Sequence, residues 1–134
     1  MSLAPYLAET TAVQLHLAVV LLAFVLGAWV LFRAKGTPVH KRLGRIWMGL
    51  MAAASISSFF IPATLVPLYG GFGVIHLLSV WVLINIGIAV WAARTGRIRQ
   101  HRIWVTATYV GALIGAGAGA MVPGRLISQM LGYG

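Results

Sequence analysis

The chain has 134 residues, of which 60% are hydrophobic and 8% are charged. A water-soluble domain with this composition would expose large apolar patches, so we predict an integral membrane protein. The formal net charge is +9, but the basic residues border apolar stretches, which favours topology signals and lipid contacts over nucleic-acid binding. The chain has no cysteine, which excludes disulfides, thiolate metal sites and covalent haem attachment.

Four apolar stretches follow one another along the chain, and each is long enough to cross the hydrocarbon core, which takes about 20 residues of helix. They run from about 11 to 32, 43 to 66, 73 to 93 and 103 to 121. We therefore expect one transmembrane domain over residues 1–134, an all-α integral membrane four-helix bundle. The first segment lacks the features of a cleaved signal peptide, so the first stretch is expected to be a retained helix.

The basic residues predict the orientation, because Arg and Lys accumulate in loops that stay on the cytoplasmic side. The middle connection has no basic residue, and Glu9 and Arg125 fall on the same side as that connection. We expect a multi-pass protein of a bacterial inner (plasma) membrane, with both termini on the periplasmic or outer side. Nine of the ten basic residues lie in the first and third connections, at Arg33, Lys35, Lys41, Arg42, Arg45, Arg94, Arg97, Arg99 and Arg102.

The two halves of the chain resemble each other, which predicts two copies of one helical hairpin running in the same direction. We expect these parallel repeats to form a bundle with a pseudo-twofold axis along the membrane normal. A competing register of fifty-seven residues comes from Arg-Ile-Trp at 45–47 and 102–104. The main matched pairs are His16 with His76 and Gly27 with Gly87, both sixty residues apart, and His40 with His101, sixty-one residues apart.

Ionisable residues within membrane spans are costly, so the four histidines are the candidate functional residues. The predicted topology places His16 and His76 in an outer layer, and His40 and His101 in an inner layer. A pair of neutral imidazoles is one usual way to hold the iron of a low-spin haem. We predict a b-type haem bound by His16 and His76, and a second candidate haem bound by His40 and His101.

Small and basic residues complete the two candidate haem sites. Gly27 and Gly87 lie eleven residues after the outer histidines on nearly the same helix face, where a macrocycle would press on the backbone. Two haems in opposite leaflets would carry electrons across the membrane. Arg125 could meet the propionates of the outer haem, and those of the inner haem could meet Arg42, Arg45, Arg99 or Arg102.

Other interpretations stay open. A histidine near a helix end is often an interfacial residue bonded to a neighbouring helix. The chain could then be a non-catalytic accessory or structural subunit of a larger respiratory or photosynthetic complex, or a homo-oligomer. Transport of a proton or metal ion along the histidines is a third possibility, although the spans lack a carboxylate. Helix packing, or a bound quinone or lipid, is favoured by small residues at four-residue spacing, at Gly49, Ala53 and Ser57 and at Gly111, Gly115 and Gly119.

Several motifs together resemble an uncharacterised bacterial family of predicted four-helix membrane proteins, a domain of unknown function. The resemblance extends over about residues 16–125; it implies the fold and assigns no activity. Gly73-Val74 stand where that family often has Ser-Pro, so the start of the third helix differs. The four histidines also give a looser architectural likeness to di-haem transmembrane b-type cytochromes. The motifs are His40-Lys-Arg-Leu-Gly-Arg-Ile-Trp47, Ile75-His-Leu-Leu-Ser79, His101-Arg-Ile-Trp104 and Pro123-Gly-Arg125.

Overall fold

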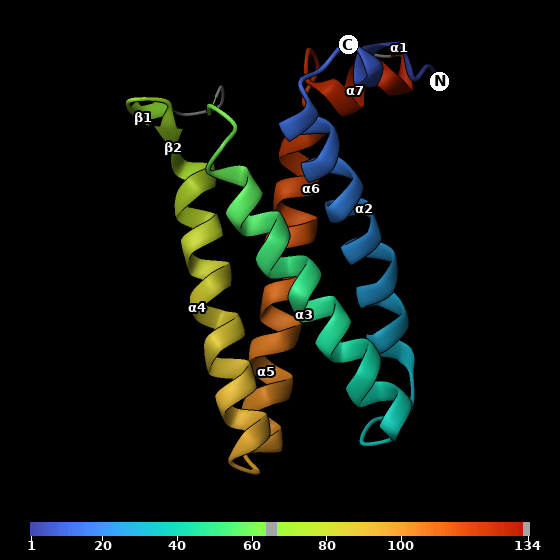
Figure 1. The fold of residues 1–134 in the computed structure, drawn as a ribbon, viewed down its shortest axis with the longest axis vertical. Helices are drawn as coiled ribbons and strands as arrows, with labels where there is room; N and C mark the ends of the chain where they lie inside the picture. Colours follow the sequence, from blue (N-terminus) through green and yellow to red (C-terminus); the bar gives the residue numbers. More distant parts are fainter. Residues whose placement is uncertain (64–66, 133–134) are drawn as a thin grey trace.

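The computed structural model describes residues 1–63 and 67–132 of the chain, and most of these residues are helical. Four long helical segments lie side by side (Figure 1). Two short helices, α1 (Ala4–Leu7) and α7 (Leu126–Leu131), pack against each other beside the chain ends. The long segments are α2 (Thr11–Phe32), α3 (Pro38–Ser58), α4 (Val74–Arg94) and an unbroken run of α5 (Ile98–Thr108), the π-helix η1 (Tyr109–Ile114) and α6 (Gly115–Ala120).

Three of the described helices are long and apolar enough to cross a membrane, namely Thr11–Phe32, Val74–Arg94 and Ile98–Ala120. The remaining long helix, α3, has 21 residues but carries Lys41 and Arg45 among the basic residues of its first two turns. These charges lower its hydropathy, so the span predicted at 43–66 is not among the three. Moreover, α3 ends at Ser58, and the predicted end at residue 66 lies outside the described residues.

The turn between α2 and α3 is built by local hydrogen bonds. The ammonium group of Lys35 donates to the carbonyl oxygens of Val30, Leu31 and Arg33 near the end of α2. Thr37 then caps α3, because its hydroxyl oxygen accepts from the backbone N–H of His40 at 3.1 Å. This cap places His40 in the first turn of α3.

Each long segment packs against the next one along the chain, and Figure 1 places α2 and α4 on opposite sides of α3. The segment η1 also contacts both α2 and α4. Both chain ends lie at one end of the bundle, together with the hairpin of β1 (Pro67–Tyr69) and β2 (Phe72–Gly73). The two basic connections lie at the other end, which we call the inner end.

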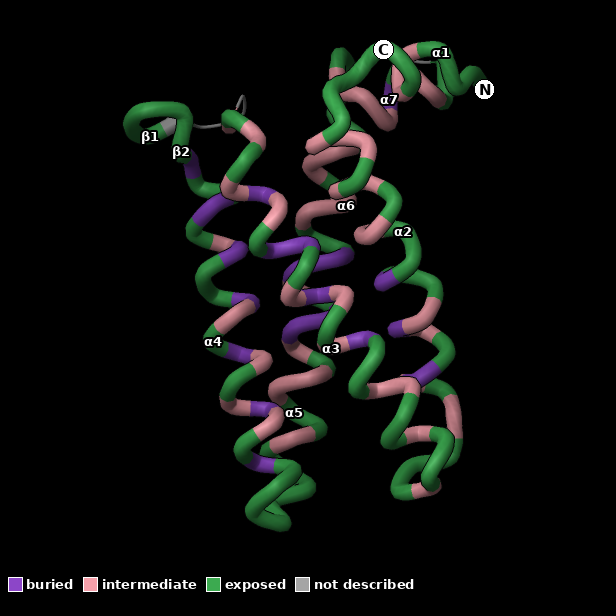
Figure 2. Tube along the Cα trace, viewed as in Figure 1, coloured by how far each residue is buried: buried purple, intermediate pink, exposed green. Residues whose placement is uncertain are grey.

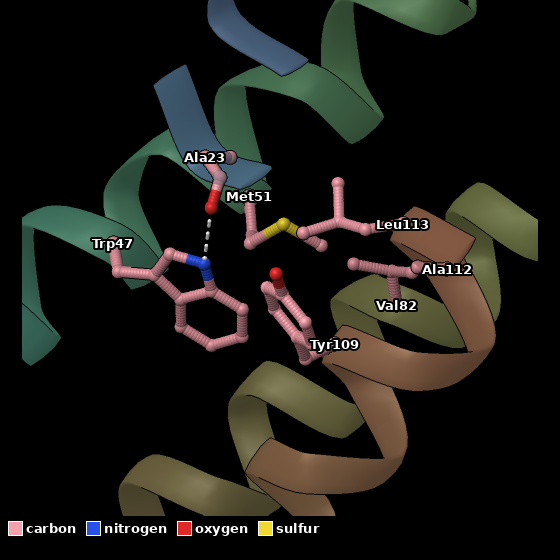
Figure 3. Packing of buried hydrophobic residues seen from close by; sticks show 7 residues of the cluster. All are labelled: Ala23, Trp47, Met51, Val82, Tyr109, Ala112 and Leu113. Atoms are coloured by element: carbon pink, nitrogen blue, oxygen red, sulfur yellow. Dashed lines mark hydrogen bonds between the residues drawn. The ribbon is translucent and has the colours of Figure 1, made fainter. Parts of the chain in front are cut away.

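The buried residues are few and include segments spread along most of α4 and part of α3, while most of the surface is exposed (Figure 2). Exposed side chains include large apolar ones, such as Phe32 with 90% of its surface exposed. Such a surface is unfavourable in water but normal against lipid tails. The core cluster consists of Ala23, Trp47, Met51, Val82, Tyr109, Ala112 and Leu113 (Figure 3).

Two aromatic side chains of this cluster fit closely against Gly27 of α2. The indole N–H of Trp47 donates to the carbonyl oxygen of Ala23 at 2.9 Å (Figure 3), and the hydroxyl of Tyr109 donates to that of Phe24 at 3.0 Å. A Cβ atom at Gly27 would overlap the Trp47 indole and lie 2.6 Å from Cδ2 of Tyr109. The absence of a side chain at Gly27 therefore lets both rings reach the α2 backbone.

Candidate functional site

His76 lies in the first turn of α4, and only 4% of its surface is exposed. Its Nδ1 accepts from the backbone N–H of Gly73 at 3.0 Å, so we assign the ring proton to Nε2. That Nε2–H faces two carbonyl oxygens, of Ser58 at 2.9 Å and Ile61 at 3.0 Å. Both ring nitrogens are thus engaged, and no lone pair is left for a metal.

The surroundings of His76 are those of a packed structural residue. The ring of Phe59 stacks on the imidazole with centroids 5.7 Å apart, and Phe72 meets it edge-on at 5.0 Å. Nearby, the hydroxyls of Ser58 and Ser79 form a hydrogen bond of 2.6 Å between α3 and α4. His76 therefore joins the start of α4 to the end of α3.

His16 is bonded to α3 as well, from the opposite side. Its Nδ1 lies 2.8 Å from the hydroxyl oxygen of Ser57, and that hydroxyl donates to the carbonyl oxygen of Ala54 at 2.9 Å. His16 therefore donates through Nδ1–H to Ser57. Since His16 and His76 bond to different residues of α3, the structure does not bring them together as a ligand pair. The predicted outer haem finds no support in this geometry.

The other residues predicted for the outer haem also have unequal surroundings. Gly27 contacts the core rings, which gives it a packing role in place of the predicted macrocycle contact. Gly87 is exposed, and a Cβ there would meet nothing within 4 Å. Arg125 precedes α7, where its carbonyl oxygen accepts from the hydroxyl of Ser128 at 2.7 Å. The matched glycines of the two halves are therefore not equivalent in space.

His101 lies in the first turn of α5 at the inner end of the bundle. Its Nδ1 is 2.8 Å from the carbonyl oxygen of Ala89 on α4, so Nδ1 carries the proton and donates it. The lone pair of the imidazole is consequently on Nε2. Histidines that bind metals usually donate their other N–H to a carbonyl or carboxylate in this way. His101 thus has the orientation and tautomer of a potential ligand.

His40 faces the same region from α3. Its Nδ1 is buried and has no hydrogen-bond partner among the described residues. Burial lowers the pKa of His40 below its ordinary value of 6.5, and the positive charge of Lys35 lowers that pKa further. The neutral form of His40 therefore predominates at pH 7.

Helical geometry directs both inner histidines into the bundle. On α3, His40 and the buried Trp47 are seven residues apart, so their side chains share a face within about 20°. Gly44 is half-buried on the same face, and a Cβ there would meet nothing within 4 Å. On α5, His101 shares a face with Thr108, which is 1% exposed. The face between His40 and Trp47 therefore has unfilled space beside its glycine.

Asn85 is a further candidate that the sequence analysis missed. It lies in the middle of α4 with 1% of its surface exposed, and both polar atoms of its amide lack partners among the described residues. It is one turn from Ala89, the hydrogen-bond partner of His101. A buried unpaired amide costs about 1–3 kcal/mol, so it calls for a functional explanation. The sequence does contain a signal for this site, because Asn85 is a polar residue within an otherwise apolar part of the predicted span.

The described residues contain no group of three or more His, Cys, Asp or Glu side chains that could hold a metal ion. A bis-histidine haem needs only two protein ligands, because the porphyrin supplies the other four nitrogens. The unpartnered Nδ1 of His40, the lone pair of His101 and the space beside Gly44 are compatible with such a group. The inner pair therefore fits the predicted haem chemistry better than the outer pair.

Acidification is expected to destabilise the inner end of the bundle. Because the pKa of His40 is lowered in the folded state, the unfolded chain binds more protons below about pH 6.5. The free energy of unfolding should therefore keep its full value above pH 6.5. It should decrease as the pH falls from there towards the lower pKa that His40 has in the folded state. Thermal unfolding in detergent between about pH 7.5 and about pH 5 should show a smaller decrease for His40→Gln. Identical pH profiles of the two proteins would contradict this role of His40.

The residue pattern of the chain matches a known protein family. The model of the family DUF2306, described as predicted membrane protein, matches residues 13–131. No curated protein and no solved structure matches the chain. The matched range includes all four histidines and all of the long helices except the first two residues of α2. The chain belongs to the DUF2306 family of predicted membrane proteins.

Proposed function

We propose that this membrane protein binds one b-type haem at the inner end of its bundle and carries single electrons. The observation that supports the proposal is that each inner imidazole has a ring nitrogen for which the described residues provide no hydrogen-bond partner. Nδ1 of His40 is buried without a partner among the described residues, and the proton of His101 is held by Ala89, which leaves Nε2 free to bind iron. The proposal reverses the order expected from the sequence, which put the outer pair first.

The chain would contribute the position and protonation of both ligands. The lowered pKa of His40 keeps its ring neutral at pH 7, which an iron ligand requires. The hydrogen bond from His101 to the Ala89 carbonyl fixes the ring orientation and the tautomer in which Nε2 carries the lone pair. Trp47 and Tyr109 of the buried core lie seven and eight residues further along the chain than His40 and His101, respectively. A bound haem would supply the one-electron carrier itself.

The proposal includes α3 as a fourth membrane span, with its basic first turns at the level of the lipid headgroups. Two aromatic–cation contacts near the basic connections support this placement. The guanidinium of Arg33 lies 6.0 Å from the ring centroid of Trp29, and that of Arg97 lies 4.7 Å from Trp91. With the basic connections inside, the haem would lie in the cytoplasmic leaflet and both chain ends would lie outside.

The test is the absorption spectrum of protein purified from cells with ample haem. We expect a Soret band that shifts on reduction with dithionite, the low-spin signature of two imidazole ligands, and one haem per chain. Folded protein that is colourless, and that takes up no haem when it is added to the purified sample, would rule the proposal out.

A second candidate function is that of an accessory subunit in a larger membrane complex. The observation that favours it is the open glycine face of α6 formed by Gly115 and Gly119, where a Cβ at either residue would meet nothing within 4 Å. Such faces allow close helix packing in lipid. Co-purification with a large complex, without any bound chromophore, would favour this function over electron transfer.

A further inference from the structure

The surface of α3 that faces away from the histidines carries a basic groove at the inner end. The groove has a volume of about 370 Å³ and is lined by Pro38, Lys41, Arg42, Arg45 and Ile46. Around the helix, the side chains of Lys41, Arg42 and Arg45 lie about 100° to 200° from His40, which points into the bundle. These cations are thus directed outward, and Arg42 and Arg45 are poorly placed for the propionates of an inner haem.

No acidic side chain of the chain can neutralise this groove. The only carboxylate side chain in the sequence is Glu9, which precedes α2 and lies at the opposite end of the bundle. Three cations within five residues on one helix repel one another unless an anion lies between them. Arginine binds phosphate oxygens with two parallel hydrogen bonds, so a phosphate group suits this set of side chains.

An exposed apolar stripe continues from the groove along α3 towards the outer end. The stripe follows Arg42, with Ile46, Gly49 and Ala53 four, seven and eleven residues further along the helix. Each of these three lies within about 40° of Arg42 around the helix axis, so they share one face. All four are exposed, and a Cβ at Gly49 would meet nothing within 4 Å. Beyond Ile46, the small residues Gly49 and Ala53 let an acyl chain lie close to the helix backbone.

We propose that this groove and stripe together bind one anionic phospholipid, with the phosphate between Lys41, Arg42 and Arg45 and an acyl chain along Gly49 and Ala53. The inference is independent of the haem and requires only that the basic turns of α3 lie at the headgroup level. The combination of cations and apolar stripe favours a lipid over free phosphate, which would gain nothing from the stripe. The bound lipid would neutralise the charges at the start of α3.

The test uses the full chain, reconstituted in vesicles of equal parts phosphatidylglycerol and phosphatidylcholine and then analysed by native mass spectrometry in detergent. Wild type should retain one phosphatidylglycerol per chain, and the double variant Arg42→Gln with Arg45→Gln should retain about tenfold less. The matched control, Arg94→Gln with Arg97→Gln, removes the same charge from the other basic connection and should retain the lipid. Equal losses in the two double variants would mean unspecific charge attraction and would overturn the proposal.

A second pair of variants tests the apolar stripe without changing charge. Gly49→Leu should reduce phosphatidylglycerol retention, whereas Gly87→Leu, at an exposed glycine of α4, should not. Inorganic phosphate added in excess should leave the bound lipid in place. Displacement of the lipid by phosphate, together with unchanged retention in Gly49→Leu, would identify a simple anion site and overturn the assignment of a phospholipid.

Discussion

The substitution Gly27→Ala is expected to destabilise the protein by about 3 kcal/mol, because one methyl group would separate two core rings from α2. A Cβ at this position would lie 2.6 Å from Cδ2 of Tyr109 and would overlap the indole of Trp47. Both rings would have to move, and their hydrogen bonds to the carbonyl oxygens of Ala23 and Phe24 would lengthen or break. Thermal unfolding in detergent measures the loss.

The sequence itself offers the control, because Gly87 is the partner of Gly27 in the proposed repeat. A Cβ at Gly87 would meet nothing within 4 Å, so Gly87→Ala removes no contact. Alanine favours the helix over glycine by about 1 kcal/mol, so this variant should be unchanged or slightly more stable. Similar losses of stability in both variants would contradict the close packing at Gly27.

The substitution His76→Phe is expected to cost about 2–3 kcal/mol, because it keeps an aromatic ring in place but removes every hydrogen bond of the imidazole. The N–H of Gly73 and the carbonyl oxygens of Ser58 and Ile61 would then lose their contacts with the imidazole. Thermal unfolding should show the loss, while the amount of haem per folded chain should stay the same. His76→Gln keeps one donor and one acceptor and should lose less.

The opposite pattern would assign His76 a different role. If His76→Phe were as stable as wild type but lost its haem, His76 would be a ligand and its backbone contacts would be secondary. Measuring stability and haem content on the same samples separates the two outcomes. His16→Ala should lose less stability than His76→Phe, because it removes a single hydrogen bond, to Ser57.

The membrane character could be predicted from composition alone, since three apolar helices and the family match agree with it. The position of α3 in the membrane could not be predicted from composition, because this helix is polar at its start and apolar further along. Lys41, Arg42 and Arg45 make its first turns polar, while Trp47 and Met51 further along are buried in the core. The mean hydropathy of α3 averages over both parts, so it shows neither the polar start nor the buried apolar part of the helix.

The hydrogen bonds of the histidine rings could not be predicted, because most of their partners are distant in the sequence. His76 donates to the carbonyl oxygen of Ser58, the last residue of α3, and to that of Ile61 just after the helix, eighteen and fifteen residues earlier in the chain. His101 instead bonds to Ala89 within its own hairpin, which leaves Nε2 free. The predicted repeat pairs these residues by position but carries no information about which ring nitrogen of each histidine has a free lone pair.

The π-helix was equally invisible in the sequence. The run from Tyr109 to Ile114 interrupts the regular helix beside the core and contacts α2 and α4. Trp81 of α4 packs against it, so closely that a Cβ at Gly111 would lie 2.8 Å from Cη2 of the indole. Around the matched glycines the packing also differs, because a Cβ at Gly27 would overlap Trp47 and Tyr109, whereas a Cβ at Gly87 would meet nothing within 4 Å.

The most direct test compares haem content per folded chain in the four variants His16→Ala, His40→Ala, His76→Ala and His101→Ala. Each variant would be purified from haem-replete cells, and its Soret absorbance would be divided by the amount of folded, monodisperse protein. The account predicts that His40→Ala and His101→Ala lose the band, whereas His16→Ala and His76→Ala keep it. A band that is lost with the outer histidines and kept with the inner ones would contradict the account.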